Sequence, residues 1–283
     1  MPKLVDLSVA IDPDYWEPDP VKRKVIDHKR GADRLGSALV YLNSKNWMSR
    51  CWEWLKWRCG WGMNHKDFPD HKGLSLMFYH LSTHTGTHMD APYHYGDVNQ
   101  QGQPQKTITD IPLEWCYGQG LVIAVSHDVK RGAISLSEMM QAITLQNLRV
   151  EANDIVFFHT GADKYQGTPH YYSKFRGISR EATDWLISQG VKVIGIDSFS
   201  FDPPFADMVT HYLETGNKSV LWPAHMLGRE KEYCQLERLA NLDQLPIDKK
   251  FKVSCFPIKL EKADAAWCRV VAILDEEVNC HAA

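Results

Sequence analysis

The sequence predicts an α/β protein with a mixed sheet, and two observations support this fold class. Short apolar runs rich in β-branched residues recur along the chain, and in its second half they alternate with segments that carry helix signals. Such runs are typical of strands that are mostly buried on both faces. Four segments fit this description: GLVIAVS (120–126), DIVFFHT (154–160), KVIGIDS (192–198) and RVVAILD (269–275).

Two segments between these runs have the signals of helices. SLSEMMQAITLQN (135–147) opens with a serine that can cap a helix, and Glu138 follows in its first turn. SREATDWLISQG (179–190) opens with Ser179 and closes at Gly190, a residue typical of helix ends. The alternation of these helices with the apolar runs predicts strands that are joined by helical connections.

The segment from about 30 to 75 has a different composition. It is rich in tryptophan among Lys, Arg and Cys, and NWMSRCWEWLKW is predicted to form an amphipathic helix. The helix could pack in the core or against another subunit, or it could line a pocket for an apolar or aromatic substrate. We expect one domain over 1–283 with an insertion at about 30–75. The tryptophans of the segment are Trp47, Trp52, Trp54, Trp57 and Trp61.

The composition is that of an ordinary globular protein and excludes several classes. The chain has 283 residues, and a formal net charge of −3 gives no indication of a nucleic-acid surface. No stretch approaches the roughly 18 apolar residues of a membrane span, and the N-terminus has no long apolar signal region. Seven cysteines, never spaced as CxxC, indicate reduced thiols. We therefore expect a cytoplasmic protein.

The stretch HTGTHMDAPYH (84–94) is the strongest candidate for a functional site. If residues 78–88 continue as one strand, His84, His88 and, just beyond the strand, Asp90 all occupy even-numbered positions and project to the same side. There they could converge on one cation. Imidazole nitrogen with carboxylate oxygen suits Zn²⁺, Mn²⁺ or Fe²⁺ better than Ca²⁺ or Mg²⁺. The alternative is a hydrogen-bonded polar loop.

Other catalytic templates are absent from the sequence. It has no GxSxG, GxGxxG or Walker A sequence, and no local signature of a cysteine nucleophile. A metal that activates water is therefore the most economical source of chemistry. Within the stretch, Gly86 lets the backbone approach closely and Pro92 ends the strand ladder.

The stretch resembles the HxGTHxDxPxH signature of the metal-dependent cyclase/hydrolase family, which includes bacterial kynurenine formamidase, isatin hydrolase and polyketide cyclases. In that family a later His, and a Glu twelve residues on, complete a binuclear site; His225 and Glu237 have that separation here. GVKVIGIDSFSFDPP (190–204) and FPIKLEKADAAWCRVVAILDEE (256–277) also look like segments of the family. The Trp-rich segment departs from its pattern.

The resemblance implies a fold, a metal site and an assembly. The fold would be a swivelling β/β/α domain, here with a Trp-rich helical insertion, assembled as a homodimer or homotetramer. One or two divalent ions, Zn or Mn, would be bound in each chain. His84, His88 and Asp90 would hold the first ion, with Asp90 as the bridge.

The same resemblance implies that His225 and Glu237 hold a second ion and that His94 is the general acid/base. From the residues alone, His225 could instead be a helix-capping surface residue and Glu237 one charge on a solvated helix face. Asp197 and Asp202 follow a predicted strand, where sites often form, but capping is an equal alternative.

The leading hypothesis is a metal-dependent hydrolase of a C–N or C–O acyl bond, in an aryl formamide, a lactam or a lactone, that uses metal-activated water. The first alternative is a natural-product cyclase with the same metal site. The second is a noncatalytic ligand-binding protein, although the presence of His94 argues against it. No substrate-binding residue is assigned from the sequence, and the substrate is expected to be a small molecule.

Overall fold

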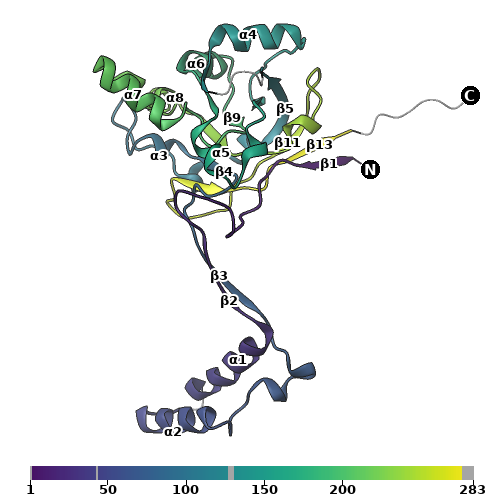
Figure 1. Cartoon of the computed structure of the whole chain (residues 1–283), viewed down its shortest axis with the longest axis vertical. Helices are drawn as coiled ribbons and strands as arrows, with labels where there is room; N and C mark the ends of the chain where they lie inside the picture. Colours follow the sequence, from purple (N-terminus) through teal and green to yellow (C-terminus); the bar gives the residue numbers. More distant parts are fainter. Residues whose placement is uncertain (1, 43, 127–130, 276–283) are drawn as a thin grey trace, which may run out of the picture. The chain divides into compact units, whose positions relative to one another are not determined.

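A computed structural model of the chain describes residues 2–42, 44–126 and 131–275. The chain forms two compact units (Figure 1). The main unit comprises Met1–Pro20 and Ser82–Ala283, and the inserted unit comprises Val21–Leu81. The sequence predicted an insertion at about 30–75, and the inserted unit extends further on both sides.

The described residues of the main unit form a nine-stranded sheet, and its strands are mixed in direction as predicted. β5, β7, β9 and β10 are parallel neighbours, and antiparallel strands flank them on both sides. In spatial order the strands are β1 (Lys3–Asp6), β13 (Val271–Leu274), β11 (Phe251–Ser254), β5 (Tyr117–Ala124), β7 (Ile155–His159), β9 (Val193–Ile196), β10 (Cys234–Glu237), β4 (His88–Asp90) and β12 (Ala265–Trp267).

The central strands are apolar because both of their faces are covered. All residues of β7 and β9 are buried. Phe157 packs into one hydrophobic cluster and its neighbour Phe158 into another, so β7 separates two cores. Fully burying such a side chain stabilises the fold by about 1.5–3 kcal/mol relative to leaving it exposed. This burial explains the continuous apolar runs in the sequence.

Helices contribute to the second of these clusters. α4 (Leu136–Leu145) supplies Met139 and α6 (Arg180–Ser188) supplies Leu186. The predicted serine caps are confirmed, because the hydroxyls of Ser135 and Ser179 accept hydrogen bonds from backbone N–H groups in the first turns. The other α-helices of the main unit are α3 (Pro92–Tyr95), α5 (Pro169–Ser173), α7 (Phe205–Thr215) and α8 (Pro223–Leu227).

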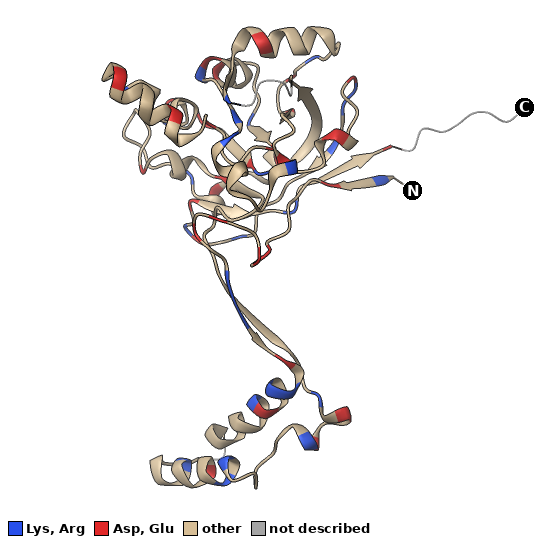
Figure 2. Ribbon diagram, in the orientation of Figure 1, with Lys and Arg blue, Asp and Glu red and all other residues tan. Residues whose placement is uncertain are grey.

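Shorter elements complete the main unit. β6 (Gly132–Ile134) and β8 (Arg176–Ile178) form a small parallel pair. Acidic and basic residues both occur throughout the described ribbon of the unit (Figure 2). Among the described residues, no helix is long and apolar enough to cross a membrane. The 3-10 helices are η3 (Ile108–Asp110), η4 (Leu113–Trp115), η5 (Asp163–Tyr165), η6 (Lys218–Val220) and η7 (Leu242–Gln244).

The inserted unit is a two-stranded ribbon followed by helices. β2 (Lys22–Ile26) and β3 (Leu76–His80) pair antiparallel, and α1 (His28–Leu42) packs against α2 (Trp47–Arg58). The helix predicted from the Trp-rich segment is therefore present as α2, capped by Asn46. No side chain of α2 is buried, so within this chain α2 is not a core helix. The remaining elements are η1 (His65–Asp67) and η2 (Pro69–His71).

Candidate metal centre

The strand pairing of β4 brings together residues that are distant in the sequence. β4 carries His88 and Asp90, and β10 pairs with it so that Glu237 lies opposite His88. His84 lies in the turn just before β4, and His225 lies on the short helix α8. Three of these residues come from the 84–94 stretch by local geometry. Glu237 joins them through sheet pairing, and His225 joins them from α8.

The prediction of one continuous strand over 78–88 was wrong. β3 ends at His80 in the inserted unit, and β4 begins only at His88. The turn between them places Gly86 at φ 69°, and a Cβ there would lie 3.0 Å from Ile11. A turn at this glycine, and not strand parity, therefore brings His84 back beside His88.

His84, His88 and Asp90 form a tight group. Asp90 Oδ1 lies 3.0 Å from His84 Nδ1 and 3.3 Å from His88 Nε2. The same two imidazole nitrogens are 3.2 Å apart. The three residues predicted as ligands of the first ion thus present their donor atoms to one another around a single point.

Glu237 connects this group to His225. Its Oε2 lies 3.6 Å from His88 Nε2, and its Oε1 lies 3.7 Å from His225 Nε2. Oε1 also accepts a hydrogen bond of 2.7 Å from the backbone N–H of Phe201. Both residues are buried, and Glu237 lies on a strand. His225 as a surface cap and Glu237 on a solvated helix face were therefore wrong alternatives.

Three of the histidines share one arrangement, in which one ring nitrogen faces an acceptor and the other faces the cluster. In a neutral ring, the nitrogen that faces an acceptor outside the cluster carries the proton, so the opposite nitrogen can present its lone pair to a cation in the cluster. The acceptor pairs are His84 Nε2 with Asp264 Oδ2 (3.0 Å), His88 Nδ1 with the Gly86 carbonyl oxygen (2.8 Å) and His225 Nδ1 with Asp202 Oδ2 (2.6 Å).

The electrostatics of the cluster favour a bound cation. Both carboxylate oxygens of Asp90 are buried, and among the described residues no hydrogen-bond donor is aligned with either. Burial alone would lower the pKa of His84, but the charges of Asp90 and Asp264 raise it to about 9. A buried carboxylate that faces converging imidazole nitrogens and accepts no aligned hydrogen bond among the described residues fits a divalent metal ion.

His94 lies beside the cluster on α3, which Pro92 begins. Its ring centroid is 4.4 Å from that of His84 and 5.5 Å from that of His225. Its side chain is 30% exposed, unlike that of the buried His88. All six residues predicted for the site are therefore gathered in one place, with His94 on its accessible side.

A second group of possible ligands is already satisfied by the protein. His159, Asp163 and Asp197 bring their donor atoms within 4.8 Å of one another. The carboxylate of Asp197, however, accepts hydrogen bonds from the N–H groups of Thr160 and Gly161 and from the Thr160 hydroxyl. Asp197 therefore holds a loop together and has no free oxygen for a metal.

Two residues of the centre were not assigned from the sequence. For Asp202 the sequence left a functional role and a capping role open. In the structure its carboxylate contacts Nδ1 of His225 and orients that ring. Asp264 was not predicted at all. Its local sequence carries no signal, because it reaches the centre through the pairing of β12 with β4, in which Ala265 lies opposite Asp90.

Comparison with known proteins agrees with this geometry. The model of the family described as "Putative cyclase" matches residues 5–203, which is more than half of the chain. The chain belongs to this family. It is therefore an enzyme of the hydrolase and cyclase class. The matched range includes the 84–94 stretch and ends before His225 and Glu237, which lie at the same place in the folded structure.

Individual cyclase relatives extend the comparison. Kynurenine formamidase of Paracidovorax citrulli (strain AAC00-1) is 31% identical over 68% of the chain and 76% of the relative. Kynurenine formamidase of Erythrobacter litoralis (strain HTCC2594) is 28% identical over 68% of the chain and 73% of the relative. Isatin hydrolase A from Ralstonia solanacearum shares the fold, with a TM-score of 0.69, 20% identity and coverage of 97% of this chain and 92% of that one.

Proposed function

We propose that the protein is a metal-dependent hydrolase of a C–N or C–O acyl bond, and that its substrate is an aryl formamide, a lactam or a lactone. The observation that carries the proposal is the buried carboxylate of Asp90, which faces converging imidazole nitrogens beside the part-exposed His94. The names of the relatives support it, because two are kynurenine formamidases and one structural neighbour is an isatin hydrolase.

His84, His88 and Asp90 would hold one ion, and His225 with Glu237 would hold a second, Zn or Mn in each case. When bound, such an ion supplies a Lewis acid for the scissile carbonyl and lowers the pKa of a coordinated water to about 7. Asp90 lies between the two groups of ligands and is the candidate for a shared carboxylate. Asp202 and the Gly86 carbonyl oxygen hold two of the imidazoles in the orientation that binding requires.

His94 would move the protons of the reaction. Its Nδ1 lies 3.5 Å from the carboxylate of Asp264, which leaves Nε2 as the nitrogen that accepts and returns a proton. It would take a proton from the attacking water and return it to the leaving nitrogen or oxygen. This side chain is accessible while His88 and Asp90 are buried, so the substrate would approach over His94.

The test is a hydrolysis assay on the full chain, freed of metal and then loaded with Zn²⁺ or Mn²⁺. An N-formyl arylamine, an aryl-fused lactam and an aryl lactone represent the three substrate classes. We expect metal-dependent turnover of at least one, abolished by a chelator. If the metal-loaded enzyme hydrolyses none of the three substrates, the proposal is contradicted. Ring closure of a linear precursor, without hydrolysis, would favour the cyclase alternative.

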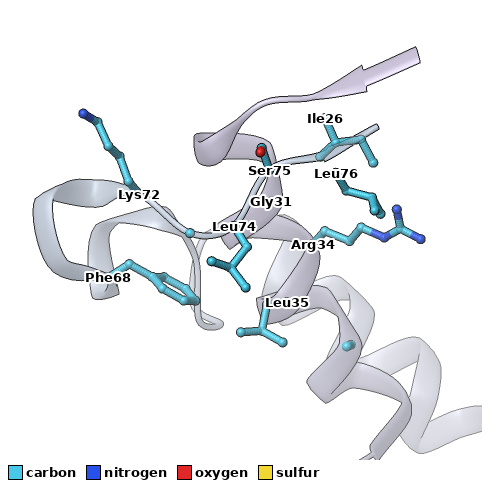
Figure 3. A pocket seen from close by; sticks show the side chains of 11 residues that line it. Ile26, Gly31, Arg34, Leu35, Phe68, Lys72, Leu74, Ser75 and Leu76 are labelled. Atoms are coloured by element: carbon cyan, nitrogen blue, oxygen red, sulfur yellow. The ribbon is translucent and has the colours of Figure 1, made fainter. Parts of the chain in front are cut away.

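We also propose that the chain forms a homodimer or homotetramer through the inserted unit. Both strands of its ribbon are exposed apart from the partly covered Ile26, and a two-stranded ribbon is marginally stable on its own. Trp61 is 78% exposed and Leu74 is 87% exposed. Leu74 also borders an open groove of about 710 Å³, where Leu35 and Phe68 turn toward it (Figure 3). Exposed apolar surface of this extent marks an interaction site.

Light scattering in solution tests this assembly. We expect an oligomer for the natural chain and a shift toward monomer for Trp61→Glu combined with Leu74→Glu. Leu145→Glu is the matched control, because Leu145 is equally exposed but lies on α4 of the main unit. A natural chain that stays monomeric at tens of micromolar would contradict the proposal.

A further inference from the structure

Asp264 is held firmly at the edge of the metal centre. It precedes β12, which pairs with β4, and its carbonyl oxygen accepts a hydrogen bond of 2.9 Å from the N–H of Ala91. Its Oδ1 accepts hydrogen bonds from the N–H of Ala265 (2.9 Å) and from the hydroxyl of Thr83 (3.1 Å). Backbone pairing and both Oδ1 contacts therefore determine where the second oxygen, Oδ2, points.

Oδ2 faces two imidazoles at once. It lies 3.0 Å from His84 Nε2 and 3.5 Å from His94 Nδ1. The side chain of Asp264 is 39% exposed, so the carboxylate remains partly hydrated while it contacts both rings. The His94 imidazole beside it holds the pKa of Asp264 well below its usual range, against the opposing effect of partial burial. A charged acceptor thus lies between a predicted ligand and the predicted acid/base.

We propose that Asp264 is a positioning residue that selects the tautomers of both His84 and His94 through one carboxylate oxygen. This inference rests on the proposed function, in which His84 binds metal and His94 moves protons. When the His84 ring is neutral, an acceptor at Oδ2 keeps its one proton on Nε2, so that the Nδ1 lone pair would be available to a cation beside Asp90 and His88. It keeps the proton of His94 on Nδ1, so that Nε2 is free to accept a proton.

Direct coordination by Asp264 is the competing assignment, since the donor atoms of His84, His94 and Asp264 lie within 4.8 Å of one another. The direction of the His84 ring argues against it. Nδ1 of this ring faces Asp90, and Nε2, on the other side, faces Asp264. Asp264 therefore contacts His84 from the side opposite to the cluster and acts on the cluster through the ring.

The experiment compares Asp264→Ala and Asp264→Asn with Glu114→Ala, an exposed carboxylate outside the centre. Titration of metal-free protein with Zn²⁺ in a calorimeter measures affinity and stoichiometry. We expect Asp264→Ala to raise Kd by about 10–100-fold with the stoichiometry unchanged. Asp264→Asn keeps an oxygen acceptor and should recover part of this loss. Loss of one zinc equivalent would identify Asp264 as a ligand and overturn the proposal.

Nitrogen NMR of the metal-free protein with labelled histidine reads the tautomers directly, independently of any substrate. The spectra are recorded above the pKa of His84, which is raised to about 9, so that the ring is neutral. We expect the ring nitrogen shifts of His84 and His94 to move toward tautomer mixtures in Asp264→Ala and to stay unchanged in Glu114→Ala. Unchanged tautomers would refute the assignment even if the protein hydrolyses all substrates. Changed tautomers would sustain it even if the hydrolysis assay fails, so the two proposals are separately testable.

Kinetics on the zinc-loaded enzyme supplies a third measurement. Because a misplaced proton on His94 affects the reaction more than binding, Asp264→Ala should lower kcat by about 10-fold or more, with KM changed by less than about 3-fold. Asp264→Asn should restore part of kcat. An equal effect of both variants on KM alone would contradict a role in proton transfer.

Discussion

Replacing His94 by alanine is expected to lower kcat by about 10²–10⁴-fold, the usual contribution of a positioned general acid or base. Metal content should not change, because His94 flanks the group of His84, His88 and Asp90 and is not one of its members. Folding should also be preserved, since the side chain is part-exposed and the truncation leaves no large cavity in the core. The loss should therefore appear in kcat and leave zinc affinity within a few fold.

The measurement is steady-state kinetics on the substrate that the assay identifies, with the metal content of each variant determined in parallel. His211→Ala is the matched control, because His211 is an exposed histidine on α7 outside the centre. A loss below about 3-fold in His94→Ala would remove His94 from the mechanism. A loss of bound zinc would make it a ligand instead.

Removal of metal is expected to destabilise the natural chain, and Asp90→Asn should abolish this dependence. A ligand at roughly 1,000 times its Kd stabilises a protein by about 4 kcal/mol. Zinc should therefore raise the Tm of the natural chain by several degrees. Asp90 is the carboxylate whose two oxygens lack any aligned donor among the described residues, so its charge contributes most directly to the attraction of a cation.

Zinc affinity should also depend on pH, because metal and proton compete for the same lone pair. In the metal-free chain the pKa of His84 is raised to about 9. Below this pH a bound proton must leave before Nδ1 can coordinate, so affinity should fall as the pH drops. Unfolding curves with zinc and with a chelator, at two pH values, measure both effects. Asp163→Asn, in the satisfied group around Asp197, is the control and should keep the response of the natural chain to zinc.

The residues of the centre differ in how far the sequence could reveal them. Those of the 84–94 stretch are close neighbours in the chain, and His225 with Glu237 were added by a resemblance in spacing. Their mutual distances were not predictable, and the expectation of a continuous strand was wrong. A turn at Gly86 forms where alternation had suggested an extended chain, because a glycine can adopt positive φ without strain.

In the inserted unit, too, the sequence predicted the local structure but not the packing. The helix α2 follows from the local pattern of residues 46–58, including its Asn46 cap. Whether its tryptophans are covered depends on what packs against them, and the sequence left core packing, subunit packing and a substrate pocket open. Within the chain no tryptophan of α2 is buried, so the structure excludes core packing for this helix in the single chain.

By itself, the sequence determined the alternation of buried strands with capped helices and indicated His84, His88 and Asp90 as candidate ligands, because both depend on side chains that are near one another along the chain. Only the tertiary structure decided that Asp264 and Asp202 belong to the centre and that Glu237 faces His88. These contacts depend on the pairing of β10 and β12 with β4 and on the position of α8. Register between strands so distant in sequence is set by the packing of the whole sheet, which no local pattern encodes.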